Sequence, residues 1–207
     1  MAIALDEFLP DVAAEAYTVP TRMALTELRK AAKDLCRRSN AWRDVQGSGS
    51  YTAGTRTYVL APPTGGVILR TERVVLDGAR TLYPVSFDVT PADWKTKQGG
   101  VLCFMELSPG VIDLLRVPDT DGTFEYAVVC SPADDAASLP DVLFHSHYDT
   151  ILHGALWRLH TMLEKPWTSA TAAGYHQGRF FAGVNQARVD ANKLGSADLR
   201  VEPRPFV

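Results

Sequence analysis

The sequence lacks the features of several protein classes. It has 3 cysteines in 207 residues, and no CxxC or CxH spacing joins them, which argues against a disulfide framework and a zinc finger. No apolar run is long enough to span a bilayer, and the first residues lack the basic region and long apolar run of a signal peptide. The formal net charge of −3 argues against a surface that binds nucleic acid throughout. We therefore expect a soluble protein, made in a reducing cytoplasm, that has no membrane contact.

Common enzyme motifs are also absent. The sequence has no GxSxG nucleophile elbow, P-loop or GxGxxG, and the run Gly47-Ser48-Gly49 alone predicts a flexible junction. Residues 119–122 begin like a calcium loop but lack the third acidic ligand and the closing Glu, so they predict a hairpin turn. The cysteines have apolar neighbours and are expected in the core. These absences favour a protein that is not an enzyme and has no cofactor.

One histidine-rich run could bind a metal ion. The sequence His145-Ser146-His147-Tyr148-Asp149 is similar to the HxHxD metal-binding run of metallo-β-lactamase-like hydrolases, but Thr150 stands where that family has a further His. The apolar pattern predicts a helix, in which His145 and His147 lie about 200° apart and cannot bind one ion. His145, Asp149 and His153 share a flank, but the outer two are about 12 Å apart, so only an i, i+4 pair could supply ligands. We expect no metal here and keep a metal-dependent hydrolase using His145, His147 and Asp149 as an alternative.

Apolar residues recur at helical spacing at both ends of the chain. A short helical turn is predicted over residues 11–16, a long helix over residues 21–40, another over residues 141–163, and a last helix that ends at Leu194. Thr168 or Ser169 can cap the last helix, and Gly195 suits the position after its end.

The region of these last two helices also contains glycines and large aromatic residues. Gly174, Gly178 and Gly183 are costly inside a helix, so we expect close helix–helix approach at all three. The aromatic residues could stack on nucleic-acid bases, but their helical spacing favours core or helix–helix contact. They are Trp157, Trp167, Phe180 and Phe181.

The middle of the chain has a pattern of period two with turn residues between its segments. Six short strands of this kind predict an antiparallel sandwich or small barrel. The predicted strands cover residues 51–60, 67–76, 81–89, 101–107, 111–117 and 124–130. The expected class is therefore α+β, with residues 1–45 and 133–195 forming a helical bundle and residues 46–132 forming an inserted antiparallel β-sandwich or barrel domain.

Two further segments are candidates for contact with partners. Residues 22–43 contain seven basic and two acidic residues. This is either a solvated helix face or a surface for DNA, an acidic partner or a neighbouring subunit. The basic residues proposed for such a contact are Arg29, Lys30, Lys33, Arg37 and Arg38. Residues 196–207, SADLRVEPRPFV, carry no pattern that could bury itself, so we expect an extended arm that docks onto a neighbour. An arm of this kind indicates an assembly protein.

Short motifs in a fixed order span nearly the whole chain. They are Val19-Pro20, Leu28-Arg29-Lys30-Ala31-Ala32 with Cys36-Arg37-Arg38, Trp42, Arg73 to Gly78 with Leu82-Tyr83-Pro84, Leu139-Pro140-Asp141, Ile151 to Leu156 with Leu159, Lys165-Pro166-Trp167, and Arg204-Pro205-Phe206. In combination they resemble the adaptor, or head-to-tail connector, proteins of short-tailed bacteriophages, of the tail tubular protein A type. His145, His147 and His153 are not part of that pattern.

The resemblance implies a virion structural protein in the tail or neck, assembled in the bacterial host cytoplasm. It implies a ring of copies of the chain, usually twelve, that joins the portal protein to the tail nozzle protein and forms part of the DNA-ejection channel. Non-specific contact with channel DNA would accompany this role. The resemblance makes residues 196–207 the portal-binding arm, with the contact residues Leu199, Val201, Pro203, Arg204, Pro205 and Phe206. A neck or tail-completion protein of a long-tailed phage is the other alternative, for which sixfold rather than twelvefold rings are expected.

Overall fold

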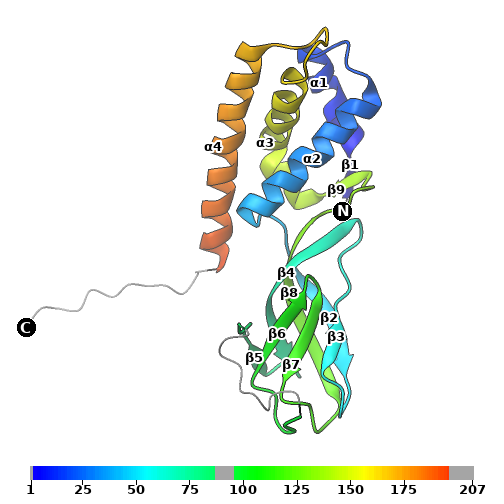
Figure 1. Ribbon diagram of the computed structural model, residues 1–207, viewed down its shortest axis with the longest axis vertical. Coiled ribbons are helices and arrows are strands. Elements are labelled where there is room, and N and C mark those ends of the chain that lie inside the picture. Colours follow the sequence, from blue (N-terminus) through cyan, green and yellow to red (C-terminus); the bar gives the residue numbers. More distant parts are fainter. Residues whose placement is uncertain (1, 87–95, 196–207) are drawn as a thin grey trace, which may run out of the picture.

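The computed structural model describes residues 2–86 and 96–195, with the helices at one end of the molecule and the two larger sheets at the other (Figure 1). The helices are a 3-10 turn Leu5–Phe8, α1 Leu9–Glu15, α2 Thr21–Ser39, α3 Asp141–His160 and α4 Ala170–Gly195. The strands are β1 Ala2–Ala4, β2 Arg43–Tyr51, β3 Thr57–Val59, β4 Gly66–Leu76, β5 Arg80–Leu82, β6 Cys103–Ser108, β7 Val111–Leu115, β8 Gly122–Pro132 and β9 Ser138–Pro140. The chain is thus a mixture of α-helices and antiparallel sheets.

Helix α2 lies where the apolar pattern predicts it and packs on both α3 and α4. It buries Leu28, Ala31 and Leu35 on one face, while Lys30 and Arg37 are exposed on the other. The helix ends at Ser39 and is capped by Asn40, which has a left-handed φ of 57° and whose N–H donates to the carbonyl of Cys36 at 2.9 Å.

Helix α3 is less regular than predicted. It ends at His160, and the backbone of His147 is non-helical (φ −134°, ψ 19°). The break lies between Phe144 and Tyr148, whose rings both pack against Phe8 of the N-terminal segment. Of the two residues expected to cap α4, Thr168 and Ser169, it is Ser169 whose Oγ accepts a hydrogen bond from the N–H of Ala172 at 3.3 Å.

The glycines of α3 and α4 differ in their surroundings. A Cβ on Gly183 would collide with the Thr150 side chain, so close approach is confirmed there. Gly174 and Gly178 would place a Cβ in open space, and the expectation of close approach at these two positions is wrong in the isolated chain. Gly154 of α3, which the sequence did not single out, lies against Phe180. The aromatic residues do serve helix packing, since the Trp157 and Phe180 ring centroids are 5.9 Å apart.

The strands form three antiparallel sheets, with orders β2-β8-β4-β5, β3-β7-β6 and β1-β9. None of these sheets closes into a barrel, so the barrel prediction is wrong for the part of the chain that the structure describes. Strands β1 and β9, which the period-two pattern missed, pair to join the N-terminus to the start of α3. The predicted strand over residues 81–89 is β5 as far as Leu82, and residues 87–89 lie outside the described ranges.

Two predictions near the start of the sheets are wrong. Gly47-Ser48-Gly49 is not a flexible junction but part of β2, paired with β8. A Cβ on Gly49 would lie 2.7 Å from the Phe124 ring, so glycine admits an aromatic ring from the neighbouring strand. Residues 51–60 are not one strand, because the chain turns after Tyr51 and β3 joins the other sheet.

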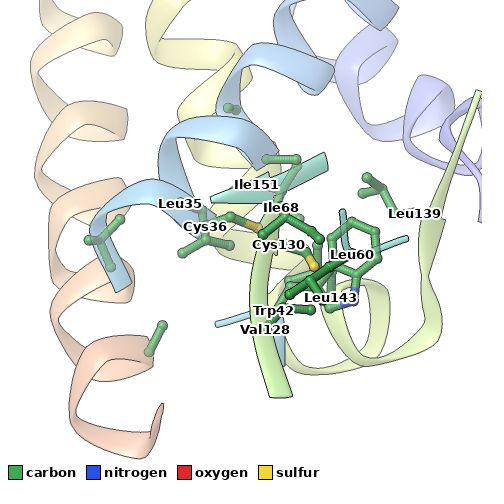
Figure 2. Packing of buried hydrophobic residues seen from close by; sticks show 14 of the residues in the cluster. Leu35, Cys36, Trp42, Leu60, Ile68, Val128, Cys130, Leu139, Leu143 and Ile151 are labelled. Atoms are coloured by element: carbon green, nitrogen blue, oxygen red, sulfur yellow. The ribbon is translucent and has the colours of Figure 1, made fainter. Parts of the chain in front are cut away.

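One hydrophobic cluster connects the helices to the sheets. Figure 2 shows Leu35 and Cys36 from α2 close to Trp42, Cys130 and Ile68. Burial raises the pKa of Cys130 to about 12, which keeps the thiol protonated, as expected for a core cysteine. The Trp42 ring covers Gly66, where a Cβ would lie 2.6 Å from the indole. The helices and strands therefore share a continuous core.

Candidate functional site

The basic face of α2 lines a groove of about 390 Å³. Five cationic and two acidic side chains surround it: Arg29, Lys30, Lys33, Arg37, Arg158, Asp34 and Asp134. The sequence predicted four of the cations as contact residues. It missed Arg158, which α3 supplies, and Asp134, which follows β8. The groove therefore carries an excess of positive charge.

Two of the predicted cations hold the turn after β8 against α2. Lys33 forms an ion pair with Asp134, and Arg29 Nε donates to the carbonyl of Ala136 at 2.8 Å. The hydrogen bond from Lys33 holds the pKa of Asp134 below its usual value. These two side chains are occupied within the chain.

Asp34 holds two further cations. It accepts hydrogen bonds from Arg38 Nε at 2.7 Å and from Arg158 Nη2 at 2.9 Å. Arg158 thereby connects α3 to α2, and Arg38 lies one helical turn from its partner.

Arg37 is the exception among the predicted contact residues. Lys30 pairs with the buried Glu27 at 2.7 Å, so Arg37 is the one predicted contact residue whose partner has not been named. Arg37 is exposed and makes no hydrogen bond or ion pair within residues 2–86 and 96–195. Its guanidinium group can contact a partner without breaking an existing bond.

The predicted arm residues, Leu199, Val201, Pro203, Arg204, Pro205 and Phe206, all lie outside the described residues. The structure does place the end of the helix that precedes them. Arg43 Nη1 donates to the carbonyl of Ala191 at 2.6 Å, and Arg188 Nε donates to the carbonyl of Arg38 at 3.1 Å. The last turns of α4 are therefore held beside the end of α2 and the start of β2.

The histidine run of α3 does not assemble into a site. His145 is exposed and its Nε2 lies 3.0 Å from Asp141. His147 is partly buried, and burial lowers its pKa. Together with the exposed Asp149 they form no group of potential metal ligands in the described part of the chain. The structure thus lends no support to the hydrolase alternative.

Three other contacts connect His153 and His160 of α3 and Glu15 of α1 to His176 of α4. Nδ1 of His153 and Nδ1 of His176 are 2.9 Å apart, and the rings of His160 and His176 stack with centroids separated by 5.6 Å. His176 Nε2 also lies 3.3 Å from Glu15 Oε2. Burial, to which His160 adds, lowers the pKa of His176 although Glu15 opposes the shift, which favours the neutral ring. The sequence offered a weak sign of this cluster, since His153 and His160 are seven residues apart on one helix face.

Comparison with known proteins bears on the predicted family. A family model described as the SU10 adaptor protein matches residues 2–202, nearly the whole chain. The chain belongs to the SU10 adaptor protein family. No curated protein was found to match it.

Membership of the SU10 adaptor family agrees with the resemblance carried by the sequence motifs. It supports a structural adaptor role in a phage particle, and with it a non-enzymatic protein that contacts other virion components. In the described ranges of this family member, no helix is long and apolar enough to cross a membrane. The match also extends to residue 202 and so includes the first part of the predicted arm.

Proposed function

We propose that this protein forms a dodecameric ring that connects the portal to the tail nozzle of a phage particle and lines part of the channel for DNA ejection. The observation that carries the proposal is the match to the SU10 adaptor family over residues 2–202. A ring of this kind needs surfaces for its neighbours and no catalytic centre. Its place is the tail or neck of the virion, after assembly in the host cytoplasm.

The arrangement of the elements suits a connector with two partners. Helices occupy one end of the molecule and the two larger sheets the other (Figure 1). We assign residues 1–45 and 133–195 to a helical bundle that faces the portal, and residues 46–132 to a β-sandwich that faces the nozzle. Because the two ends lie apart, one chain can contact both partners at once.

Residues 196–207 act in this proposal as the portal-binding arm. Support comes from the last turns of α4, which are held in place by two hydrogen bonds. Arg43 donates to the carbonyl of Ala191, and Arg188 donates to the carbonyl of Arg38. The arm thus starts from a fixed point, and its prolines reduce the entropy lost on docking. The proposed anchors are Leu199, Val201, Pro203, Pro205 and Phe206, with Arg204 as a polar contact.

Deletion of residues 196–207 tests the arm. Residues 2–86 and 96–195 contain a hydrophobic core of their own, so the truncated chain should keep its thermal midpoint and circular dichroism spectrum. Its co-sedimentation with capsids that contain the portal should be lost. Phe206→Ala should weaken binding at least tenfold, since buried aromatic anchors carry much of an interface's energy, whereas Glu202→Ala serves as the matched control. Normal attachment of the truncated protein would contradict the proposal.

The basic groove on α2 is proposed as the contact for an acidic segment of a neighbouring subunit. Its excess positive charge and the free Arg37 support this assignment. Four of the five predicted cations are occupied within the chain, which argues against an extended stripe for tracking DNA. Non-specific contact with channel DNA would appear as weak binding that falls steeply with salt.

A further inference from the structure

Three side chains with metal-binding atoms meet where α1, α3 and α4 come together. Glu15 is the last residue of α1, His160 is the last residue of α3, and His176 lies near the start of α4. Each offers one nitrogen or oxygen atom within 4.8 Å of those of the other two. His160 and His176 are 5% and 1% exposed, whereas the Glu15 side chain is 51% exposed. The cluster is therefore buried on one side and open to solvent on the other.

The hydrogen bonding of His160 leaves one nitrogen available. Its Nδ1 lies 2.6 Å from the carbonyl oxygen of Trp167, so Nδ1 carries the proton and donates it. The lone pair then resides on Nε2, which is buried and has no hydrogen-bond partner within residues 2–86 and 96–195. Metal-binding histidines commonly have this arrangement, because a carbonyl on one nitrogen fixes the tautomer that presents the other.

His176 is held in a similar way on its other side. Its Nδ1 lies 2.9 Å from Nδ1 of His153, which can accept a hydrogen bond from the Nδ1–H of His176 when Nε2 is used as a ligand. The distance between His176 Nε2 and Glu15 Oε2 is 3.3 Å. Two ligands with bonds of about 2.0–2.1 Å to a tetrahedral ion are separated by a similar distance. The third ligand atom, from His160, lies within 4.8 Å of the other two, so its side chain would move closer when an ion binds.

We propose that Glu15, His160 and His176 bind a divalent transition-metal ion of the zinc type. Two imidazole nitrogens and one carboxylate oxygen suit zinc or cobalt, whereas magnesium and calcium prefer sites made of oxygen alone. Water completes the tetrahedron on the side where Glu15 is exposed. This site is distinct from the histidine run at residues 145–149 and revises the expectation that the chain has no cofactor.

The surroundings of the cluster allow an ion to enter and give it a structural effect. A cavity of about 590 Å³ borders His160 and is also lined by Trp157, Gly174 and Gln177. A bound ion would connect α1 to the hairpin formed by α3 and α4. Because it binds the folded chain better than the unfolded one, the ion should raise thermal stability. This effect is independent of ring formation and portal attachment.

Metal binding by the untagged full-length chain tests the site. After treatment with a chelator and dialysis, the protein should take up one equivalent of zinc in a calorimetric titration. The thermal midpoint should rise with the zinc concentration but not with magnesium. Cobalt should produce the visible absorption of a tetrahedral ion with nitrogen and oxygen ligands. Absence of stoichiometric uptake would overturn the proposal.

Two glutamine variants separate this site from binding at the surface. Glu15→Gln replaces the carboxylate ligand by an amide whose oxygen can still accept a hydrogen bond from His176 Nε2, so the metal-free midpoint should change little while zinc binding weakens at least tenfold. His145→Gln is the matched control, because it removes an exposed histidine paired with Asp141 and should leave zinc binding unchanged. Zinc binding that survives Glu15→Gln at full affinity, or that His145→Gln abolishes, would overturn the assignment.

Discussion

At the scale of the residue, neighbouring groups decide what a glycine does. Gly154 brings α3 close to its neighbours, since a Cβ there would lie 2.7 Å from the Phe180 ring and 2.9 Å from the Cβ of Ala31. Gly178 sits on an exposed face of α4 where a Cβ would meet nothing within 4 Å. Both cost helix stability in the same way, but only Gly154 recovers that cost through packing.

Alanine at these two positions should have opposite effects. Gly154→Ala should lower the free energy of unfolding by about 1–3 kcal/mol, because the added methyl group overpacks the contact of α3 with Phe180. Gly178→Ala should raise it by about 0.5–1 kcal/mol through the better helix propensity of alanine. Chemical denaturation of both variants checks the pair. Changes of the same sign would contradict the close approach at Gly154.

At the scale of the element, the charge of α2 divides into an internal and an external part. Lys33 and Arg29 hold the turn after β8 against α2, and Arg38 pairs with Asp34 of the same helix. Arg37 projects from the same face without such a bond in the described residues. A count of basic residues in the sequence cannot make this division, because Lys33 and Arg29 bond to Asp134 and to the carbonyl of Ala136, which lie 101 and 107 positions away.

Charge reversal at Arg37 should separate folding from assembly. Arg37→Glu should change the free energy of unfolding by no more than about 0.5 kcal/mol, since the side chain is exposed. It should reduce ring formation at least tenfold if the groove accepts an acidic segment of a neighbour. Mass photometry of the assembled rings measures this effect. Arg22→Glu, on the same helix but outside the groove, is the control and should assemble normally.

At the scale of the whole molecule, the shared core couples the two ends. Trp42 is 6% exposed and lies between α2 and β2, and its carbonyl accepts a hydrogen bond from the N–H of Cys130 at 2.8 Å. Ile68 and Val128 from the sheet lie in the same cluster as Leu35 (Figure 2). The helical end and the sheet end therefore stabilise each other through the residues of this shared core.

Unfolding should accordingly occur in one transition. Helix signal in far-ultraviolet circular dichroism and tryptophan fluorescence should give the same denaturation midpoint. Trp42→Ala should lower the free energy of unfolding by about 3–5 kcal/mol and shift both signals together. Val59→Ala, at a side chain that is 79% exposed, should change it by less than about 0.5 kcal/mol. Separate midpoints for the two signals would contradict a continuous core.

The local patterns of the sequence were sufficient for most elements. Helix α2, the Ser169 cap and strand β4 lie where spacing and turn residues predicted them. The predictions failed where a distant residue decided the outcome. Gly47 and Gly49 indicated a flexible linker by themselves, but opposite Tyr126 and Phe124 they make room for aromatic rings inside a strand.

What the sequence determined by itself was therefore the order and type of most elements and, through its ordered motifs, the adaptor family. Those signals are local, since they come from helical or alternating spacing and from short runs of residues. The tertiary structure decided which cations are occupied and which histidines meet. Arg37 is distinguished from Lys33 by Asp134, about a hundred residues away. Likewise Glu15 reaches His176 across 161 positions. Charge pairing and metal binding depend on distance in space, and only the packing of the helices fixes that distance.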